Sequence, residues 1–236
     1  MKSPNLFNDN GEQIDNISRR QFLKQFAVSG LVLAVGLPTL SLAEQTNYGA
    51  DAMPHGAVDN PLVFVAIGDD GTVTIVCHRS EMGQGIRTSL PMVMADELEA
   101  DWQKVKIVQA PGDEARFGNQ DTDGSRSMRH FFMPMRRVGA AARQMLASAA
   151  ATQWQVSIDE VHAEQHYIIH SATARRLSYG ELAQAASQLA VPSRENLKLK
   201  QPADFRYIGK GQQKNYDGQQ IVNGQAQYGI DTHFAD

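Results

Sequence analysis

The stretch CHRSEMGQGIRTS, Cys77–Ser89, lies between a run of β-branched residues and a segment with helical spacing. Within it, Gly83 and Gly85 flank Gln84. Glycine accepts positive φ and allows close approach to the backbone, while a glutamine amide offers both donors and an acceptor. A following helix would also favour an anion at its start. The turn therefore predicts either a contact surface for a heterocycle that mixes N–H and C=O groups, or a tight strand-to-helix connection in which Gln84 caps backbone groups.

The residues on both sides of this turn predict strands and helices in an irregular order. Leu62–Ile67 and Thr72–His78 indicate two strands around an Asp-Gly turn. Apolar residues at helical spacing predict a helix over Ile86–Glu99, with Pro91 acceptable in its first turn. Val105–Ala110 is typical of another short strand.

The second half of the chain continues this mixture. A long alanine-rich helix is predicted over Met135–Trp154, strands within Val161–Leu177, and a third helix from Ser178. Strand pairs mixed with helices, without a regular alternation, indicate the α+β class: a mixed sheet with packed helices.

A second glycine- and hydroxyl-rich segment, DTDGSRS, covers Asp121–Ser127 directly before the long helix. Thr122, Ser125 and Ser127 supply hydroxyl groups, and Gly124 exposes backbone N–H. Such a loop predicts either a cradle for a phosphate or pyrophosphate, or an ordinary N-cap loop.

The first 43 residues predict an export signal instead of part of the fold. SRRQFLK (Ser18–Lys24) is followed by an apolar run and by SLA at residues 41–43, which is typical of a Tat signal. We therefore expect export through the Tat translocase to the periplasm. The apolar run is too short and interrupted for a stable membrane span. Residues 44–60 are expected to form a linker.

Composition excludes several classes of protein. The 236 residues carry a net charge of −4, which argues against nucleic-acid binding. Cys77 is the single cysteine, so an intrachain disulfide, a cysteine-ligated iron–sulfur cluster and a c-type haem are excluded within this chain. A redox role would require a cofactor that is held without thiolates.

Other polar residues favour structural roles. His162, His166 and His170 are expected on one strand, where they would share a face but lie too far apart for one metal ion. Ser125 and His130 lack the surroundings of a hydrolase pair. The pairs Arg136–Arg137 and Arg175–Arg176 are expected to be solvated or to lie at helix ends.

Together these stretches resemble the molybdopterin-binding subunit of the xanthine dehydrogenase/aldehyde oxidase family, and most of all its isoquinoline 1-oxidoreductase β-subunit branch. The segments that carry the resemblance cover most of the chain after the signal: His78–Trp102, Asn119–Ser127, Ala141–Trp154 and Val222–Asp231.

The resemblance implies that this chain contacts a molybdenum–molybdopterin cofactor and that the protein hydroxylates aldehydes or N-heterocycles with oxygen from water. Electrons would pass to a separate 2Fe–2S iron–sulfur subunit. The substrate, the electron acceptor and a cytosine dinucleotide form of the cofactor stay open. The implied pterin contacts are Met82, Gly83, Gln84 and Gly85, and the implied phosphate contacts are Thr122, Gly124, Ser125 and Ser127.

The chain also departs from the family pattern. Asp123 stands where many relatives have glycine, and the GGxFG-type loop and the C-terminal glutamate base of the family are absent. We therefore assign no catalytic residue and no protein metal ligand, and expect a chain that is inactive alone. Residues 61–190 would form the cofactor-binding domain, and residues 191–236 a linker and the truncated start of the next domain. The partner would be the remainder of the subunit. The alternative is a non-catalytic or degenerate periplasmic binding or scaffold module.

Overall fold

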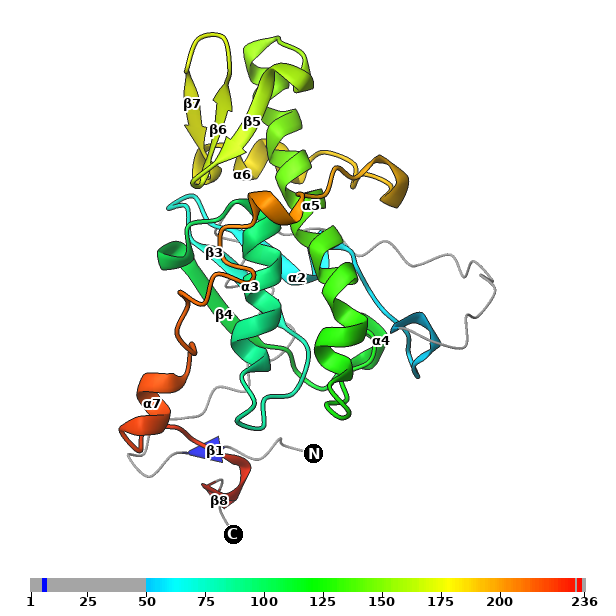
Figure 1. The fold of residues 1–236 in the computed structure, drawn as a ribbon, viewed down its shortest axis with the longest axis vertical. Helices are drawn as coiled ribbons and strands as arrows, with labels where there is room; N and C mark the ends of the chain where they lie inside the picture. Colours follow the sequence, from blue (N-terminus) through cyan, green and yellow to red (C-terminus); the bar gives the residue numbers. More distant parts are fainter. Residues whose placement is uncertain (1–5, 8–49, 232, 235–236) are drawn as a thin grey trace.

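A computed structural model describes residues 6–7, 50–231 and 233–234 (Figure 1). The expected export signal lies outside these residues except for Leu6 and Phe7, and so does the linker as far as residue 49. The helices are α2 (Pro61–Phe64), α3 (Ile86–Leu98), α4 (Glu114–Phe117), α5 (Arg126–Trp154), α6 (Tyr179–Ser187) and α7 (Gly218–Val222). The strands are β1 (Leu6–Phe7), β2 (Val65–Ile67), β3 (Val73–Cys77), β4 (Val105–Gln109), β5 (Val161–Glu164), β6 (Tyr167–His170), β7 (Arg176–Ser178) and β8 (His233–Phe234).

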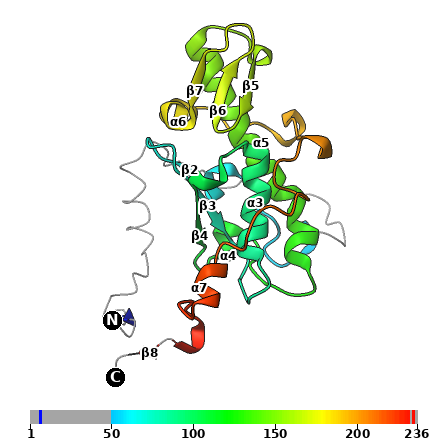
Figure 2. The ribbon, with the colours of Figure 1, turned by 60° about the vertical axis from the view of Figure 1, so that its left-hand side comes forward.

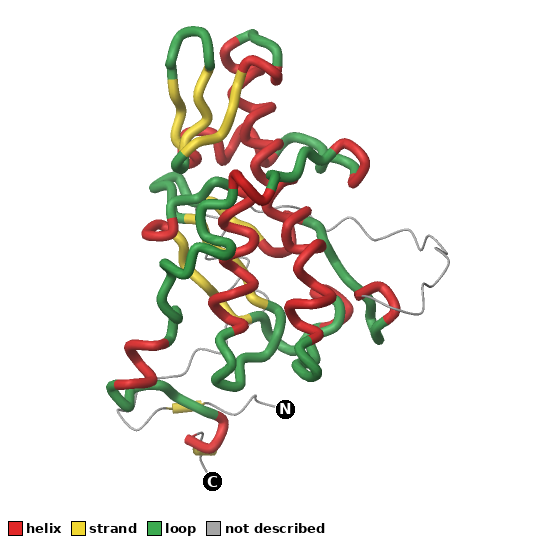
Figure 3. Tube along the Cα trace, viewed as in Figure 1, coloured by secondary structure: helices red, strands yellow, loops and turns green. Residues whose placement is uncertain are grey.

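A three-stranded mixed sheet forms the centre of the fold, in the order β2-β3-β4. β2 pairs antiparallel with β3, and β4 pairs parallel with β3 after the chain has crossed over through α3. Every residue of β3 is buried. The mixed sheet and its helices confirm the predicted α+β class, and Figure 3 shows the helices and strands by colour.

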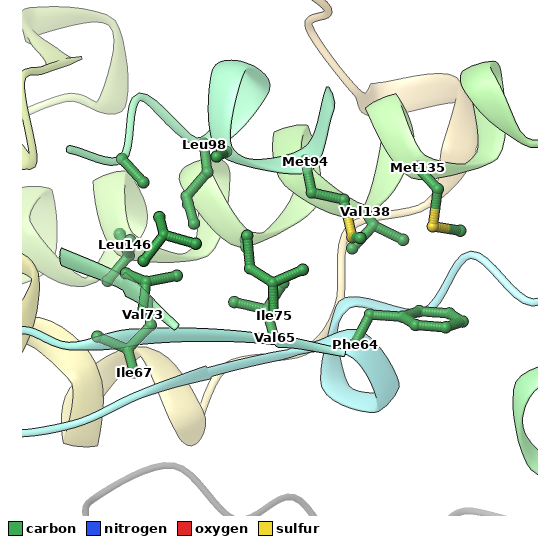
Figure 4. Close-up of a cluster of buried hydrophobic side chains, with 14 of the residues drawn as sticks. Phe64, Val65, Ile67, Val73, Ile75, Met94, Leu98, Met135, Val138 and Leu146 are labelled. Carbon is green, nitrogen blue, oxygen red and sulfur yellow. The ribbon is translucent and has the colours of Figure 1, made fainter. Parts of the chain in front are cut away.

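The core lies between this sheet and the helix pair α3 and α5. Gly139 sets the distance between the two helices, because a Cβ at this position would lie 2.4 Å from the Met94 carbonyl oxygen. Figure 4 shows the apolar side chains of both layers meeting. The labelled residues on the sheet side are Phe64, Val65, Ile67, Val73 and Ile75, and those on the helix side are Met94, Leu98, Met135, Val138 and Leu146.

A second, smaller sheet of β5, β6 and β7 lies at the far end of α5, beside α6 (Figures 1 and 2). The predicted strands within 161–177 are therefore confirmed. The helix predicted from Ser178 is confirmed too, since Ser178 and Glu181 form a capping box at the start of α6.

The expectation that His162, His166 and His170 lie on one strand was wrong. The chain reverses between β5 and β6, where Gln165 and His166 have positive φ, so the three do not lie on one strand. His166 is buried and its Nε2 lies 2.7 Å from the carbonyl oxygen of Gly71. The residue thus links the small sheet to the turn between β2 and β3.

Three helical features also differ from the expectation: an additional helical turn before the first strand, the position of Pro91 within its helix, and the start of α5. Asn60 caps a single helical turn at Pro61–Phe64, so the first strand begins at Val65 and not at Leu62. Pro91 lies beyond the first turn of α3, and α5 begins at Arg126 and continues through Pro134. Both prolines lack a backbone N–H, so neither donates the hydrogen bond expected within its helix, and both are buried.

The expectation of solvated arginines was wrong for Arg136 and Arg137. Arg136 is buried and lies 2.6 Å from the carboxylate of Glu97, which is fully buried on α3. Arg137 pairs with Asp59 at 2.6 Å. Arg175 and Arg176 are exposed, as expected.

The segment after α6 returns across the end of α3. The carboxylate of Asp96 accepts backbone N–H groups from Arg206, Tyr207 and Ile208 at 2.8–3.2 Å, and Lys200 Nζ at 2.7 Å. This part of residues 191–236 therefore packs on the domain. In the described residues, none of the helices has the length and hydropathy to cross a membrane.

Candidate functional site

The two segments singled out in the sequence lie together. Each leads directly into a helix, and the starts of α3 and α5 lie at the same end of the domain, the lower end in Figure 1. Thr122 Oγ1 donates to the Ser80 carbonyl oxygen at 2.8 Å, and Gln84 Nε2 donates to the same oxygen at 3.0 Å. We call residues 80–85 the first loop and residues 119–127 the second loop.

The first loop has the conformation that its glycines predict. Gly83 has φ 95° and Gly85 has φ 86°, both in the region that favours glycine. Gln84 Oε1 accepts the Met82 N–H at 2.6 Å, so the amide of Gln84 caps backbone groups within its own loop. The Met82 side chain at the tip is 67% exposed.

Glu81 organises the backbone of this turn. Its Oε1 accepts N–H from Gly83 at 2.7 Å and Gly85 at 2.9 Å, and its Oε2 accepts N–H from Arg87 at 2.9 Å. Partial burial alone would raise the pKa of Glu81, but these backbone donors hold it below its ordinary value. A carboxylate of the chain itself therefore occupies the start of α3, where the sequence predicted an external anion.

The second loop places its hydroxyl residues differently. Ser127 is buried, and its Oγ lies 3.4 Å from that of the half-buried Thr122. Ser125 is exposed at the N-cap of α5 with φ 58°, and its side chain makes no capping bond. Gly124 is exposed beside it with φ 44°. Thr122 thus contacts Ser80 and Ser127 contacts Arg79, whereas Ser125 and Gly124 are open to solvent.

Asp123, which departs from the family pattern, has a partner of opposite charge. Arg126 contacts both carboxylate oxygens, with Nε at 2.7 Å from Oδ1. This hydrogen bond and charge hold the pKa of Asp123 below its ordinary value. The exposed ion pair therefore offsets the repulsion that this carboxylate would exert on a phosphate.

Arg79 lies beneath the second loop, and the sequence analysis did not single it out. Its side chain is fully buried, Nε donates to Ser127 Oγ at 3.0 Å, and Nη1 contacts the carbonyl and side-chain oxygens of Asn119 at 2.6 and 2.5 Å. The guanidinium lies 4.4 Å from the centre of the Phe131 ring. Burial lowers the pKa of Arg79 to about 10, against the opposing charges of Asp121 and Asp123. At that pKa the group is still a cation at neutral pH.

His78 directly precedes Arg79 in the chain, and its ring lies between two aromatic rings. Its buried ring lies 5.1 Å from that of Phe64 and 5.0 Å from that of Phe131. Burial, together with a smaller effect of the Arg79 charge, lowers the pKa of His78 to about 3. The imidazole therefore adds no charge to the site near neutral pH.

Three residues that organise the site were missed: Arg79, Glu81 and Asn119. Arg79 and Glu81 could have been found from the sequence, because both charged residues stand in HRSE between an apolar strand and a glycine turn. Asn119 gave no local signal, because its contact with Arg79 joins residues 40 positions apart.

The two loops fit a flat polar ligand with an anionic end. A Cβ built on Gly83 meets no atom within 4 Å, so the glycine leaves open space beside the backbone. Arg79 Nη2 is buried without a hydrogen-bond partner, and Nε of the same guanidinium donates to the Ser127 hydroxyl in the second loop. In the described residues, no cluster of His, Cys, Asp and Glu could hold a metal ion directly. The open backbone at Gly83 and the unpartnered Nη2 of Arg79 could hold the organic part of a cofactor.

The chain is similar in sequence to known proteins. A sequence model of the molybdopterin cofactor-binding domain matches residues 12–234, a range that includes both loops. Isoquinoline 1-oxidoreductase subunit beta of Brevundimonas diminuta is 31% identical over 92% of this chain and 32% of its own length. A membrane-bound aldehyde dehydrogenase (pyrroloquinoline-quinone) of Gluconacetobacter polyoxogenes is 31% identical over 96% of this chain and 29% of its own length.

Among solved structures, quinoline 2-oxidoreductase from Pseudomonas putida 86 aligns with a TM-score of 0.44 and 20% identity, over 51% of this chain and 15% of that one. The chain spans less than a third of the length of the two curated relatives. The match of the sequence model over most of the chain confirms the resemblance. The chain belongs to the molybdopterin cofactor-binding domain family, as a part of a xanthine dehydrogenase-type subunit.

Proposed function

We propose that this chain is the N-terminal cofactor-binding part of a periplasmic molybdenum hydroxylase that oxidises aldehydes or N-heterocycles. The observation that carries the proposal is the shared acceptor at Ser80. Gln84 and Thr122, 38 positions apart, both donate to its carbonyl oxygen, so the two loops form one surface. A single ligand with a heterocycle and a phosphate end would contact both loops.

The residues of this surface have distinct roles in the proposal. Met82, Gly83, Gln84 and Gly85 would line the pterin, with Glu81 holding the turn in shape from behind. Ser127 would donate its hydroxyl hydrogen bond to a phosphate oxygen, and Thr122 would contact the phosphate while its own O–H stays donated to Ser80. Gly124 and Ser125 would contact the outer phosphate oxygens. The bound cofactor would supply the oxidation chemistry, and the protein would supply position and surroundings.

Location and partners follow from the sequence and from relatives. The twin-arginine stretch at residues 18–24 supports export through the Tat translocase. Relatives named as subunits support assembly with other chains. On the family resemblance, these would be the remainder of a molybdenum subunit and an iron–sulfur subunit. The catalytic base would come from the remainder, and the chain alone would be inactive. A cytosine dinucleotide form of the cofactor would extend along the second loop.

Cofactor content tests the proposal. The chain would be produced with its partner chains in a host that makes the cofactor, and molybdenum and pterin would be measured per chain. We expect near-stoichiometric loading in the wild type and a loss of at least tenfold in Thr122→Val/Ser127→Ala. Exposed Thr152→Val, far along α5, is the control. Absence of molybdenum and pterin from the folded wild-type assembly would refute the proposal and favour a scaffold module.

A further inference from the structure

The buried guanidinium of Arg79 has no carboxylate in direct contact. Its three described hydrogen bonds go to a hydroxyl, a carbonyl and an amide oxygen, and no described carboxylate forms an ion pair with it. The charges of Asp121 and Asp123 act on it only from beyond ion-pair distance. A buried cation without a directly paired anion is costly, so such groups are normally paired or bound to a ligand.

One nitrogen of this guanidinium also has no hydrogen-bond partner. Nη2 is buried and makes no hydrogen bond, while Nε and Nη1 on either side of it are bonded to Ser127 and Asn119. The planar guanidinium presents its donors in a fixed fork that matches carboxylate and phosphate oxygens. Buried polar groups are rarely left without partners, so an unused N–H pair here points to a ligand acceptor.

Two neighbouring arginines are already in ion pairs. Arg126 is bound by Asp123, and Arg87 lies 2.5 Å from Asp217. The start of α3 is filled by the Glu81 carboxylate. An anion that binds between the two loops would therefore find its charge partner at Arg79 and not at these positions.

The polar groups around Nη2 suit a phosphate. The Ser127 hydroxyl accepts from Arg79 Nε and can donate to a ligand oxygen. Thr122 Oγ1, whose O–H donates to Ser80, lies 3.4 Å from the Ser127 Oγ. The Asp121 carboxylate is occupied by the side-chain amide of Asn119 at 3.1 Å. The intervening residues 121–125 are largely exposed, and they are the part of the chain that has to shift for an oxygen to reach Nη2.

We propose that Arg79 is a phosphate-binding residue of this domain, and that its unpartnered Nη2 donates to an anionic phosphate oxygen together with the hydroxyl of Ser127, beside Thr122. The proposal deepens the proposed function and rests on it for the identity of the ligand. Arg79 would neutralise the phosphate end of the cofactor from within the core, which fixes the ligand's orientation relative to the first loop.

Inorganic pyrophosphate is the probe that tests this directly on the wild-type full chain. The ¹⁵N signals of arginine side chains would be followed by NMR during titration to tens of millimolar. We expect a saturable shift of the Arg79 Nε–H signal and a much smaller change at Arg126. No saturable change at Arg79, with or without a change at Arg126, would overturn the proposal.

Two conservative variants sharpen the test. Arg79→Lys keeps the charge but loses the fork, so we expect at least a tenfold weaker affinity for pyrophosphate. Arg126→Lys is the matched control and should stay within twofold of the wild type. Equal affinity in the two variants would contradict the proposal, and the wild-type NMR titration does not depend on whether Arg79→Lys folds.

The two proposals can fail separately. A chain that carries molybdenum and pterin but shows no Arg79 response to pyrophosphate refutes the role of Arg79 and leaves the proposed function standing. A chain that binds pyrophosphate at Arg79 but never carries pterin refutes the proposed function and keeps the anion site.

Discussion

Gln84 and Thr122 donate hydrogen bonds to one acceptor, the carbonyl oxygen of Ser80, at 3.0 and 2.8 Å. This relationship joins a glycine turn before α3 to a hydroxyl-rich loop before α5. The position of the carbonyl therefore fixes the distance between the two loops, and a ligand that contacts both depends on it.

Gln84→Ala should lower molybdenum loading of the assembled subunit by about tenfold, since several lost polar contacts of about 0.5–1.5 kcal/mol each combine. The substitution removes the acceptor of the Met82 N–H and the donor to Ser80. Molybdenum per chain would be measured, with the exposed Gln184→Ala on α6 as control. Equal loading in the two variants would remove the assignment of Gln84 to the pterin site.

Glu81→Gln should lower the free energy of unfolding at neutral pH by about 1–2 kcal/mol, because an amide has one acceptor oxygen where the carboxylate has two. The loss stays this small because the site is partly solvated. The pKa of Glu81 in the folded chain is depressed below 4.5, its ordinary value. Its stabilisation is therefore present above pH 4.5 and is lost as pH falls through the lower folded pKa.

Urea unfolding of the wild type and Glu81→Gln at pH 7 and near pH 3.5 checks this dependence. The difference between the two proteins should shrink at the lower pH. Glu164→Gln, on the exposed face of β5, should show little difference at either pH. A difference for Glu81→Gln that grows on acidification would show that the carboxylate does not organise the turn.

Glu97→Gln should cost about 3–5 kcal/mol, because it leaves buried arginine charge uncompensated. The Glu97 carboxylate is fully buried between Arg136 and Arg143, at 2.6 and 3.5 Å. The matched change Asp123→Asn breaks an exposed ion pair and should leave the thermal midpoint nearly unchanged. Similar midpoints for the two variants would mean that the buried pair does not hold α3 to α5.

Gly139→Ala should cost about 1–3 kcal/mol through overpacking. The new Cβ would lie 2.4 Å from the Met94 carbonyl oxygen and 2.7 Å from Glu97 Cβ, so α3 and α5 would have to separate. The exposed Gly112→Ala, which meets no atom within 4 Å, should change the unfolding free energy by less than about 0.5 kcal/mol. Chemical denaturation of both variants would show whether the helix spacing depends on this glycine.

The fold could be predicted from the sequence where local patterns decide it. The β2–β3 hairpin, β4, the body of α5 and the cap of α6 follow from alternation, periodicity and capping residues. The apolar spacing predicted this helix only from Met135, whereas α5 begins at Arg126 and continues through the buried Pro134.

The candidate site was predicted only in part. Both loops were found from their glycines and hydroxyls, and the structure brings them together. The contacts that organise them, from Arg79 to Asn119 and Ser127, join residues 40 and 48 positions apart. Composition near a loop does not show such pairs, and the same holds for Arg136 with Glu97, which are 39 positions apart.

Hydrogen–deuterium exchange of the subunit, prepared in hosts with and without pterin synthesis, tests the central claim most directly. The account predicts that cofactor slows exchange in the two loops, residues 80–85 and 119–127, and leaves the small sheet over 161–178 unchanged. Equal exchange of both loops in the two preparations, in a sample that contains molybdenum, would contradict the account and place the cofactor elsewhere.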